Sequence, residues 1–148
     1  MDKRQQLVSE MMDLSNQIIW LNKPELEAVL SDYTLSEIEL IENIARIPKA
    51  NVTKLATASY MTRGAISKLT KKMIQKNLIE RYQQAENKKE IYFRLTEAGE
   101  TVERIHQQLH HSFLERDKEV FVNMTQEEFD TIFRFIGRYR QHLKNITH

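Results

Sequence analysis

Residues 51–76, NVTKLATASYMTRGAISKLTKKMIQK, decide the fold of this chain. Asn51 can cap a short helix, whose inward-facing apolar side chains are Val52, Leu55 and Ala56. Residues 59–61 predict a tight turn, and Thr62 then caps a second helix that runs to about residue 76. The second helix has one apolar stripe, formed by Ile66, Leu69 and Met73. Two helices joined by a three-residue turn predict a helix-turn-helix.

A further helix is expected before this unit, over residues 36–46. Ser36 and Glu39 form the pattern of a capping box, and Leu35 and Leu40 are spaced as the hydrophobic staple around it. The proline after Ile47 ends this helix, because the residue before a proline is disfavoured in the α conformation.

A β-hairpin is expected after the helix-turn-helix. Asn77 tolerates the left-handed conformation that often follows a helix, and strands are then predicted over 78–82 and 91–95, with a projecting polar loop at 83–90. Period-two alternation predicts that the second strand buries Ile91, Phe93 and Leu95. The chain is therefore expected to be mainly α with a small β-hairpin wing, which is a winged helix-turn-helix.

The flanking segments predict long amphipathic helices. Residues 2–21 carry an apolar seam at alternating spacings of four and three, formed by Leu7, Met11, Leu14, Ile18 and Leu21. Pro24 is expected to interrupt this helix, with a short helix over 24–30 after it. A helix is predicted from Thr96 to about Val122. A last helix opens with a capping box at Thr125, and its apolar positions are Phe129, Ile132, Phe133, Ile136, Tyr139 and Leu143. Such apolar faces need a partner, either in the same chain or in a second copy.

Charge is distributed unevenly along the chain. The whole protein has a formal charge of +1, yet residues 46–94 hold twelve Lys or Arg against three acids, which gives this segment +9 and the remainder −8. A polyanion is the expected partner of such a segment, because neutralised phosphates release counterions. The absence of cysteine excludes disulfides and thiolate chemistry, and no apolar run suits a signal peptide or a membrane span. We expect a cytoplasmic protein without membrane contact, without a cofactor and without enzymatic activity.

The second helix of a helix-turn-helix lies in the major groove, so its polar face holds the candidate DNA-binding residues. Arg63 is placed near the helix start to reach base edges, where Arg pairs with guanine. Thr62 and Ser67 can donate to phosphates or bases. Three lysines are expected to contact phosphates and to set the register without reading sequence: Lys68, Lys71 and Lys72. The hairpin adds Asn87, Lys88 and Lys89. The alternative is that this basic face is only solvated, as most lysine-rich helix faces are.

Several short motifs within residues 35–99 resemble the MarR/SlyA family of bacterial winged-helix regulators. They are LSE at 35–37, LA at 55–56, ISKL at 66–69, KNLIER at 76–81, LTEAG at 95–99 and, beyond them, MTQEEF at 124–129. Asn77 departs from the glycine that the family often has there. The wing also lacks the family's Asp-x-Arg motif, so it is expected to add affinity rather than sequence readout, since Lys lacks the planar fork of Arg.

The resemblance implies a double-stranded-DNA-binding repressor that acts as a homodimer on a pseudo-palindromic operator and responds to a small molecule. It implies N-terminal dimerisation helices over 1–34, a DNA-binding domain over 35–98 and C-terminal dimerisation helices over 99–148. The expected dimer contacts join Leu7, Met11, Leu14 and Ile18 to Ile132, Phe133, Ile136 and Tyr139. Trp20 and Tyr33 are candidates for the effector crevice, although both residue types are more often ordinary core residues.

His106 and His110 are four residues apart on one helix, a spacing that can hold a divalent metal. The pair resembles the histidines of the family's zinc-sensing branch, but Leu40 and Ile41 stand near the position of that branch's further His. Glu25, Glu27 or Glu39 could supply a carboxylate instead. A metal-responsive regulator is therefore an alternative function.

The histidine pair also fits a plain polar helix surface that binds nothing. With Glu103 it also resembles part of a hydrolytic site, for which no third ligand is evident in the sequence. A winged-helix module that binds protein rather than DNA is a further alternative for the chain as a whole, and the +9 segment argues against it.

Overall fold

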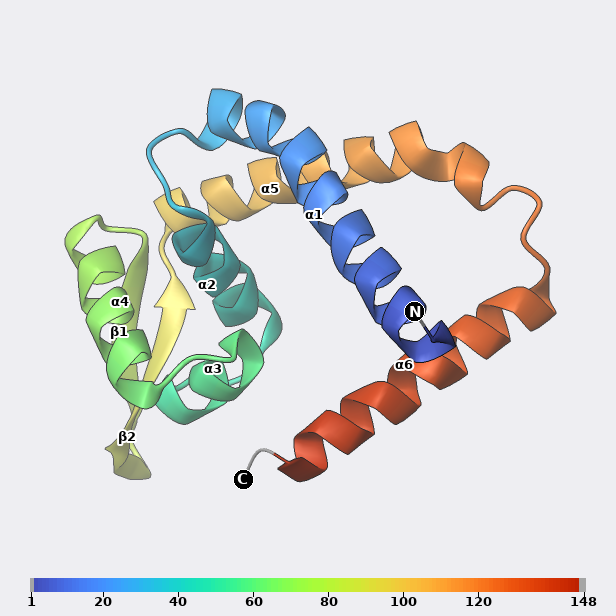
Figure 1. Cartoon of the computed structure of the whole chain (residues 1–148). Coiled ribbons are helices and arrows are strands. Elements are labelled where there is room, and N and C mark those ends of the chain that lie inside the picture. Colours follow the sequence, from blue (N-terminus) through green and yellow to red (C-terminus); the bar gives the residue numbers. More distant parts are fainter. Residues whose placement is uncertain (1, 147–148) are drawn as a thin grey trace. The chain divides into compact units, whose positions relative to one another are not determined.

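The computed structural model of the chain describes residues 2–146 (Figure 1). The elements in chain order are α1 (Lys3–Leu30), α2 (Leu35–Arg46), α3 (Val52–Ser59), α4 (Arg63–Gln75), β1 (Ile79–Gln84), β2 (Asn87–Leu95), α5 (Glu97–Asp117), the 3₁₀ helix η1 (Lys118–Val120) and α6 (Gln126–Ile146). The prediction of a mainly α fold with one antiparallel hairpin is confirmed. The chain divides into two compact units, one ending at residue 111 and one beginning at residue 112.

The helix-turn-helix forms as the sequence predicts. The Asn51 side chain accepts a hydrogen bond from Lys54 N at 2.9 Å and caps α3, and Thr62 Oγ1 accepts from Ala65 N at 3.1 Å and caps α4. α3 and α4 pack through fully buried Leu55 and Ile66. Figure 1 shows α2, α3 and α4 grouped with the two strands. Asn77 adopts the left-handed conformation expected of it, at φ 60°.

The predicted N-cap of α2 is wrong by two residues. Thr34, not Ser36, is the N-cap: its hydroxyl accepts from Glu37 N at 3.2 Å, and Glu37 Oε1 accepts from Thr34 N at 2.9 Å. This capping box places Glu37 at the third helical position and turns its side chain into the interior, where the residue is fully buried. The first turn of α2 therefore carries a buried carboxylate beside α4.

The predicted break at Pro24 is also wrong, because α1 is continuous through that proline. Proline removes the hydrogen bond that its own nitrogen would donate, and its ring crowds the carbonyl four residues earlier, but the bonds of the other residues hold the turns on either side. Leu30, at the C-terminal end of α1, is buried in the core, which fixes this end of the helix against the winged unit.

The hairpin is longer than predicted. The strands pair antiparallel from Ile79 with Leu95 to Gln84 with Asn87, with an irregularity between Tyr82 and Gln84. Most of the expected loop 83–90 is therefore strand, because backbone pairing continues through polar residues that are exposed on both faces.

The burial expected in the second strand also needs correction. Tyr92 and Phe93 are its buried residues, whereas Ile91 is 39% exposed. The Tyr92 ring lies 5.5 Å from that of Tyr82 across the hairpin, so the cross-strand aromatic pair, rather than simple alternation, decides which residue is covered.

The C-terminal segment agrees in part with its prediction. α5 ends at Asp117, five residues before the expected Val122, and η1 follows. The capping box at the start of α6 is confirmed: Thr125 N donates to Glu128 Oε1 at 3.0 Å, and Glu128 N donates to Thr125 Oγ1 at 3.1 Å. Among the helices described in residues 2–146, none is long and apolar enough to cross a membrane.

Candidate nucleic-acid interface

The apolar face of α4 packs against the core, and the polar face on the opposite side is therefore exposed. Ile66 and Met73 are fully buried against the core. The predicted DNA-binding residues of α4 lie on the opposite side: Thr62, Arg63, Lys68, Lys71 and Lys72 are exposed, and Ser67 is half-buried. A groove of about 530 Å³ runs beside this face, with Lys68, Lys71 and Lys72 among its lining residues and Met61 and Leu69 as apolar members. The fold therefore gathers these side chains on one surface, as the helical spacing predicts.

Thr62 has a structural use besides any contact with DNA. Its hydroxyl oxygen accepts the Ala65 N–H and so caps α4. The hydroxyl hydrogen can still donate to a phosphate or a base.

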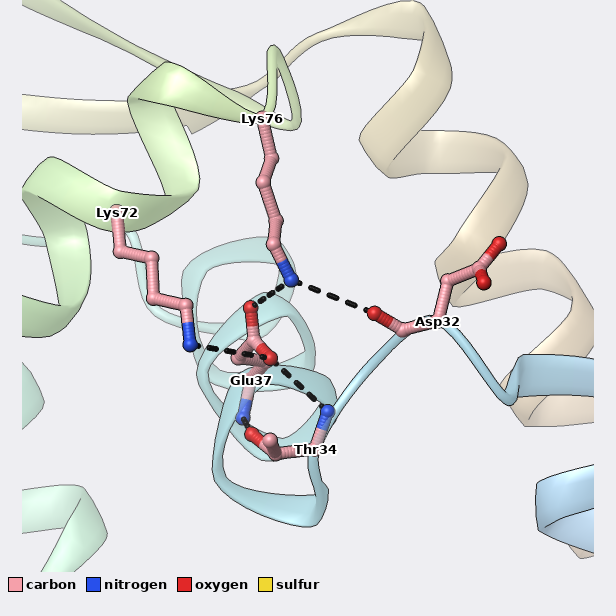
Figure 2. Close-up of polar contacts among 5 residues, drawn as sticks. All are labelled: Asp32, Thr34, Glu37, Lys72 and Lys76. Carbon is pink, nitrogen blue, oxygen red and sulfur yellow. Dashed lines mark hydrogen bonds and ion pairs between the residues drawn. The ribbon is translucent and has the colours of Figure 1, made fainter.

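Polar contacts surround the buried Glu37 carboxylate beside the C-terminal half of α4, and Figure 2 shows the residues that make them: Asp32, Thr34, Glu37, Lys72 and Lys76. Lys76 Nζ donates to Glu37 Oε2 at 2.8 Å, and Lys72 Nζ lies 4.0 Å from Glu37 Oε1. The side chain of Glu37 is 1% exposed, that of Lys76 34% and that of Lys72 53%. Lys72 is thus partly engaged within the protein, whereas it was predicted from the sequence only as a phosphate ligand.

Lys76 also reaches the connection between α1 and α2. Its Nζ donates to the Asp32 backbone carbonyl at 3.3 Å and lies 5.6 Å from the centroid of the Tyr33 ring. Tyr33, a candidate for the effector crevice, is half-buried and packs against the core. Trp20, the other candidate, is 74% exposed on α1.

The pKa of Glu37 lies below its ordinary value. Burial on its own raises the pKa of a carboxyl group, but the hydrogen bonds from Lys76 and Thr34 stabilise the carboxylate and outweigh it. Glu37 is therefore charged in the folded protein at neutral pH, and it needs its lysine partner.

The wing carries the predicted residues Asn87, Lys88 and Lys89 on β2, all exposed. The Asn87 side chain accepts from Lys89 N at 3.2 Å, and Gln83 Nε2 donates to the Lys88 carbonyl at 2.7 Å. These bonds shape the end of the hairpin and leave the two lysine ammonium groups on the surface. The wing is tied to α3 where Asn51 Nδ2 donates to Glu90 Oε2 at 3.3 Å.

A second cluster of functional groups joins α2 and α5. One ligand atom each from Glu42, His106 and His110 lies within 4.8 Å of the others, and His110 Nε2 is 2.8 Å from His106 Nε2. His106 is 3% exposed, and its buried Nδ1 has no hydrogen-bond partner in the described residues. The carboxylate that the structure adds is thus Glu42, rather than Glu25, Glu27 or Glu39.

Burial governs the protonation of this cluster. It lowers the pKa of His106, with help from the neighbouring His110, while Glu42 opposes the shift. Burial also raises the pKa of Glu103, whose Oε2 lies 3.9 Å from His106 Nδ1. A neutral imidazole is the form that binds metals, and two imidazole nitrogens with a carboxylate oxygen are a donor set that suits Zn²⁺. The residues present therefore fit a divalent metal.

The apolar seams of α1 and α6 are largely uncovered. Leu7, Met11, Leu14 and Ile18 are between 38% and 58% exposed, and Ile132, Phe133 and Ile136 between 39% and 64%, whereas Tyr139 is half-buried. Exposed apolar faces of this extent mark an interaction surface.

These features define a winged helix-turn-helix protein, with α4 as the second helix of the motif and the β1–β2 hairpin as the wing. Residues 33–91 match the family model described as MarR family. This part of the winged helix-turn-helix is thus similar in sequence to the MarR family.

Three similar proteins place this domain among known sequences and folds. The chain is 32% identical over 98 residues to the uncharacterised HTH-type transcriptional regulator YhjH of Bacillus subtilis, a match that covers 66% of this chain and just over half, 56%, of that protein. The structure resembles that of Streptococcus pneumoniae FabT in complex with DNA (TM-score 0.81, 18% identity, 98% of this chain and 100% of that one). It also resembles Staphylococcus aureus MarR in complex with salicylate and kanamycin (TM-score 0.75, 16% identity, 96% and 93%).

Proposed function

We propose that this chain is a cytoplasmic, sequence-specific DNA-binding transcriptional regulator that uses α4 to read the major groove. The observation that carries the proposal is the net charge of +9 over residues 46–94, on a segment whose polar helix face is exposed. Arg63 is the base-reading residue, Lys68 and Lys71 contact phosphates, and Lys88 and Lys89 of the wing add phosphate contacts. FabT, whose fold this chain shares, is a protein solved in complex with DNA.

A titration of the full chain with duplex DNA at a series of salt concentrations tests this function. Binding that weakens steeply with salt is expected, because each neutralised phosphate releases counterions. Arg63→Ala should weaken binding to the preferred sequence by roughly tenfold or more and relax the preference there, since a bidentate Arg–guanine pair contributes about 1–3 kcal/mol. An Arg63→Ala variant with wild-type affinity and preference would contradict the assignment of α4.

The proposed assembly is a homodimer that binds a pseudo-palindrome. The support is the pair of exposed seams on α1 and α6, which a second copy would cover. Two copies would place their α4 helices on half-sites separated by one helical turn, about 34 Å.

The proposed mode of action is repression relieved by a small molecule. The S. aureus protein that shares this fold was solved with salicylate and kanamycin. A ligand that binds better to one spacing of the two α4 helices would shift the dimer toward that spacing, and a spacing that no longer matches successive major grooves would release DNA.

A metal-responsive regulator is the second candidate function. The observation that favours it is the buried, unpartnered Nδ1 of His106 in a cluster with Glu42 and His110. Calorimetric titration of the full chain with zinc chloride should show saturable binding, lost in His106→Ala and His110→Ala and weakened in Glu42→Gln. Wild-type binding in all three variants, or no binding to the wild type, would exclude this candidate.

A further inference from the structure

Tyr60, in the turn between α3 and α4, has a backbone conformation that its bulky side chain disfavours. Tyr60 adopts φ 54° and ψ 42°, the left-handed region, where its N–H donates to the Ala56 carbonyl and ends α3. Glycine is the residue that this conformation favours, and a bulky side chain there is strained. The turn therefore requires the left-handed conformation, but not a tyrosine.

No contact of the Tyr60 side chain within residues 2–146 compensates for that strain. The Tyr60 side chain is 86% exposed, and no hydrogen bond or ring contact of its hydroxyl or ring is found in residues 2–146. A large aromatic side chain in a strained position, held in solvent, has no packing role in this unit. Such outliers concentrate where a protein contacts a ligand.

Gly64, four residues later in α4, is the opposite case. Gly64 is the second residue of the helix, where glycine is disfavoured because it loses more conformational entropy than alanine. A Cβ on Gly64 would meet nothing within 4 Å. No neighbour in the described chain therefore requires a glycine at this position.

At Tyr60 a bulky residue stands where glycine would suit the backbone. At Gly64 a glycine stands where a residue with a side chain would be more favourable in the helix. Both lie at the surface beside Arg63 and the cap Thr62, and each is unfavourable locally with no internal reason. An external surface that approaches this end of α4 explains both choices at once. It would be contacted by the tyrosine and would come close to the backbone at the glycine.

We propose that Tyr60 and Gly64 are DNA-contacting residues of this chain, a proposal that rests on the proposed function of α4. Tyr60 contacts the sugar–phosphate backbone, with its hydroxyl donating to a phosphate oxygen and its ring packing on the sugar. Gly64 lets the helix backbone approach the major-groove edge of the bases closely enough for Arg63 to reach guanine. The first residue contributes affinity on any sequence, and the second contributes to specificity.

The test of Tyr60 uses opposite effects on stability and on binding. Tyr60→Gly relieves the backbone strain, so its Tm should rise by roughly 2–4 °C. Its DNA affinity should fall about tenfold on selected and unselected duplexes alike, because a hydrogen bond to a charged phosphate is lost. Tyr60→Phe removes only the hydroxyl and should lose most of that affinity without a change in Tm.

Asn77→Gly is the matched control for Tyr60→Gly. Asn77 is also exposed and left-handed, but it follows the C-terminal end of α4. This control should keep wild-type DNA affinity and gain a smaller increase in Tm, since asparagine tolerates the left-handed region better than tyrosine does. Tyr60→Gly with unchanged affinity, or an equal loss of affinity in Asn77→Gly, would overturn the role of Tyr60.

Gly64→Ala tests the close approach. The alanine should stabilise α4 and raise the Tm, yet it should weaken binding to the selected sequence by about tenfold or more, while binding to unselected DNA changes less. Tight, selective binding by Gly64→Ala would overturn the role of Gly64. If Arg63→Ala loses affinity while the Tyr60 and Gly64 variants do not, this inference fails and the proposed function stands. If the wild type binds no duplex, both fail.

Discussion

Lys76 Nζ lies 2.8 Å from Glu37 Oε2, and this ion pair joins the C-terminal end of α4 to the first turn of α2 inside the protein (Figure 2). The same ammonium group reaches the Asp32 carbonyl of the α1–α2 connection. One lysine thus holds α4 against two segments that precede it by 39 and 44 residues in the chain. The orientation of α4, the proposed DNA-binding helix, therefore depends on a charge in the core.

Glu37→Gln is expected to destabilise the fold by roughly 2–3 kcal/mol, somewhat less than the loss of a fully buried pair because Lys76 is about one-third exposed. The side-chain amide of this variant can still accept the Thr34 N–H, so the helix cap is kept. The loss of stability therefore measures the effect of removing the carboxylate charge. Urea unfolding measures it, with Glu39→Gln, an exposed carboxyl on the same helix, as the control. Equal stability of Glu37→Gln and Glu39→Gln would contradict the structural role of the ion pair.

The same carboxylate makes stability depend on pH. The pKa of Glu37 is lower in the folded protein than its ordinary value of 4.5, so the folded state binds its proton less readily than the unfolded state. Its contribution is present above the ordinary value and is lost as the pH falls through the lowered pKa of the folded state. The difference in unfolding free energy between wild type and Glu37→Gln should therefore be constant near neutral pH and shrink in acid. A difference in unfolding free energy that grows in acid would contradict a lowered pKa of Glu37 in the folded protein.

Lys71 and Lys72 are expected to differ in their effect on DNA binding although they are neighbours. Lys71→Ala should weaken binding to all sequences about equally and reduce the salt slope by about one, as for a lost phosphate contact. Lys72→Ala should change the slope less and lower the stability more, because its ammonium lies 4.0 Å from Glu37. Fluorescence anisotropy at several salt concentrations measures both slopes. A larger slope change in Lys72→Ala would mean that the contact with Glu37 gives way to phosphate.

Gly99→Ala is expected to destabilise the fold by about 1–3 kcal/mol, the usual cost of overpacking. A Cβ on Gly99 would overlap the Leu78 carbonyl oxygen, which also accepts the Thr96 N–H at 3.1 Å. This contact brings the start of α5 against the base of the wing. Gly137→Ala is the matched control, because a Cβ there meets nothing within 4 Å. Thermal unfolding that shows equal Tm values for the two variants would contradict this packing.

Leu14→Glu is expected to turn a dimer into a monomer if α1 forms the interface, because it places a charge in the exposed seam. Sedimentation velocity measures the change, and Asn16→Glu, on the opposite side of α1, supplies the same charge outside the seam. A wild type that sediments as a monomer, or a dimer that survives Leu14→Glu, would contradict the proposed assembly.

Local signals predicted most of the helix-turn-helix. The side chains of Asn51 and Thr62 cap helices through bonds to residues three positions away, so the caps are visible in sequence. The start of α2 was misplaced because two overlapping patterns, Thr34 with Glu37 and Ser36 with Glu39, both satisfy the capping box. Only the burial of Glu37 against α4 decides between them, and that depends on a contact 39 residues away.

The members of the candidate sites that the sequence does not predict are brought there by tertiary contacts. The histidine pair was visible because its members share one helix. Glu42 was missed because it lies on α2 and joins the pair only through packing against α5. The Lys72 contact with Glu37 was missed for the same reason, and its helical spacing indicated only a surface lysine.

The most direct test of the central claim is selection of bound sequences from a random duplex pool by the full chain, at near-physiological salt. We expect a palindromic consensus with half-sites about one helical turn apart, and loss of the consensus in Arg63→Ala. Weak, salt-sensitive binding with no enriched sequence would contradict the claim, and the basic face of α4 would then be no more than a non-specific polyanion surface.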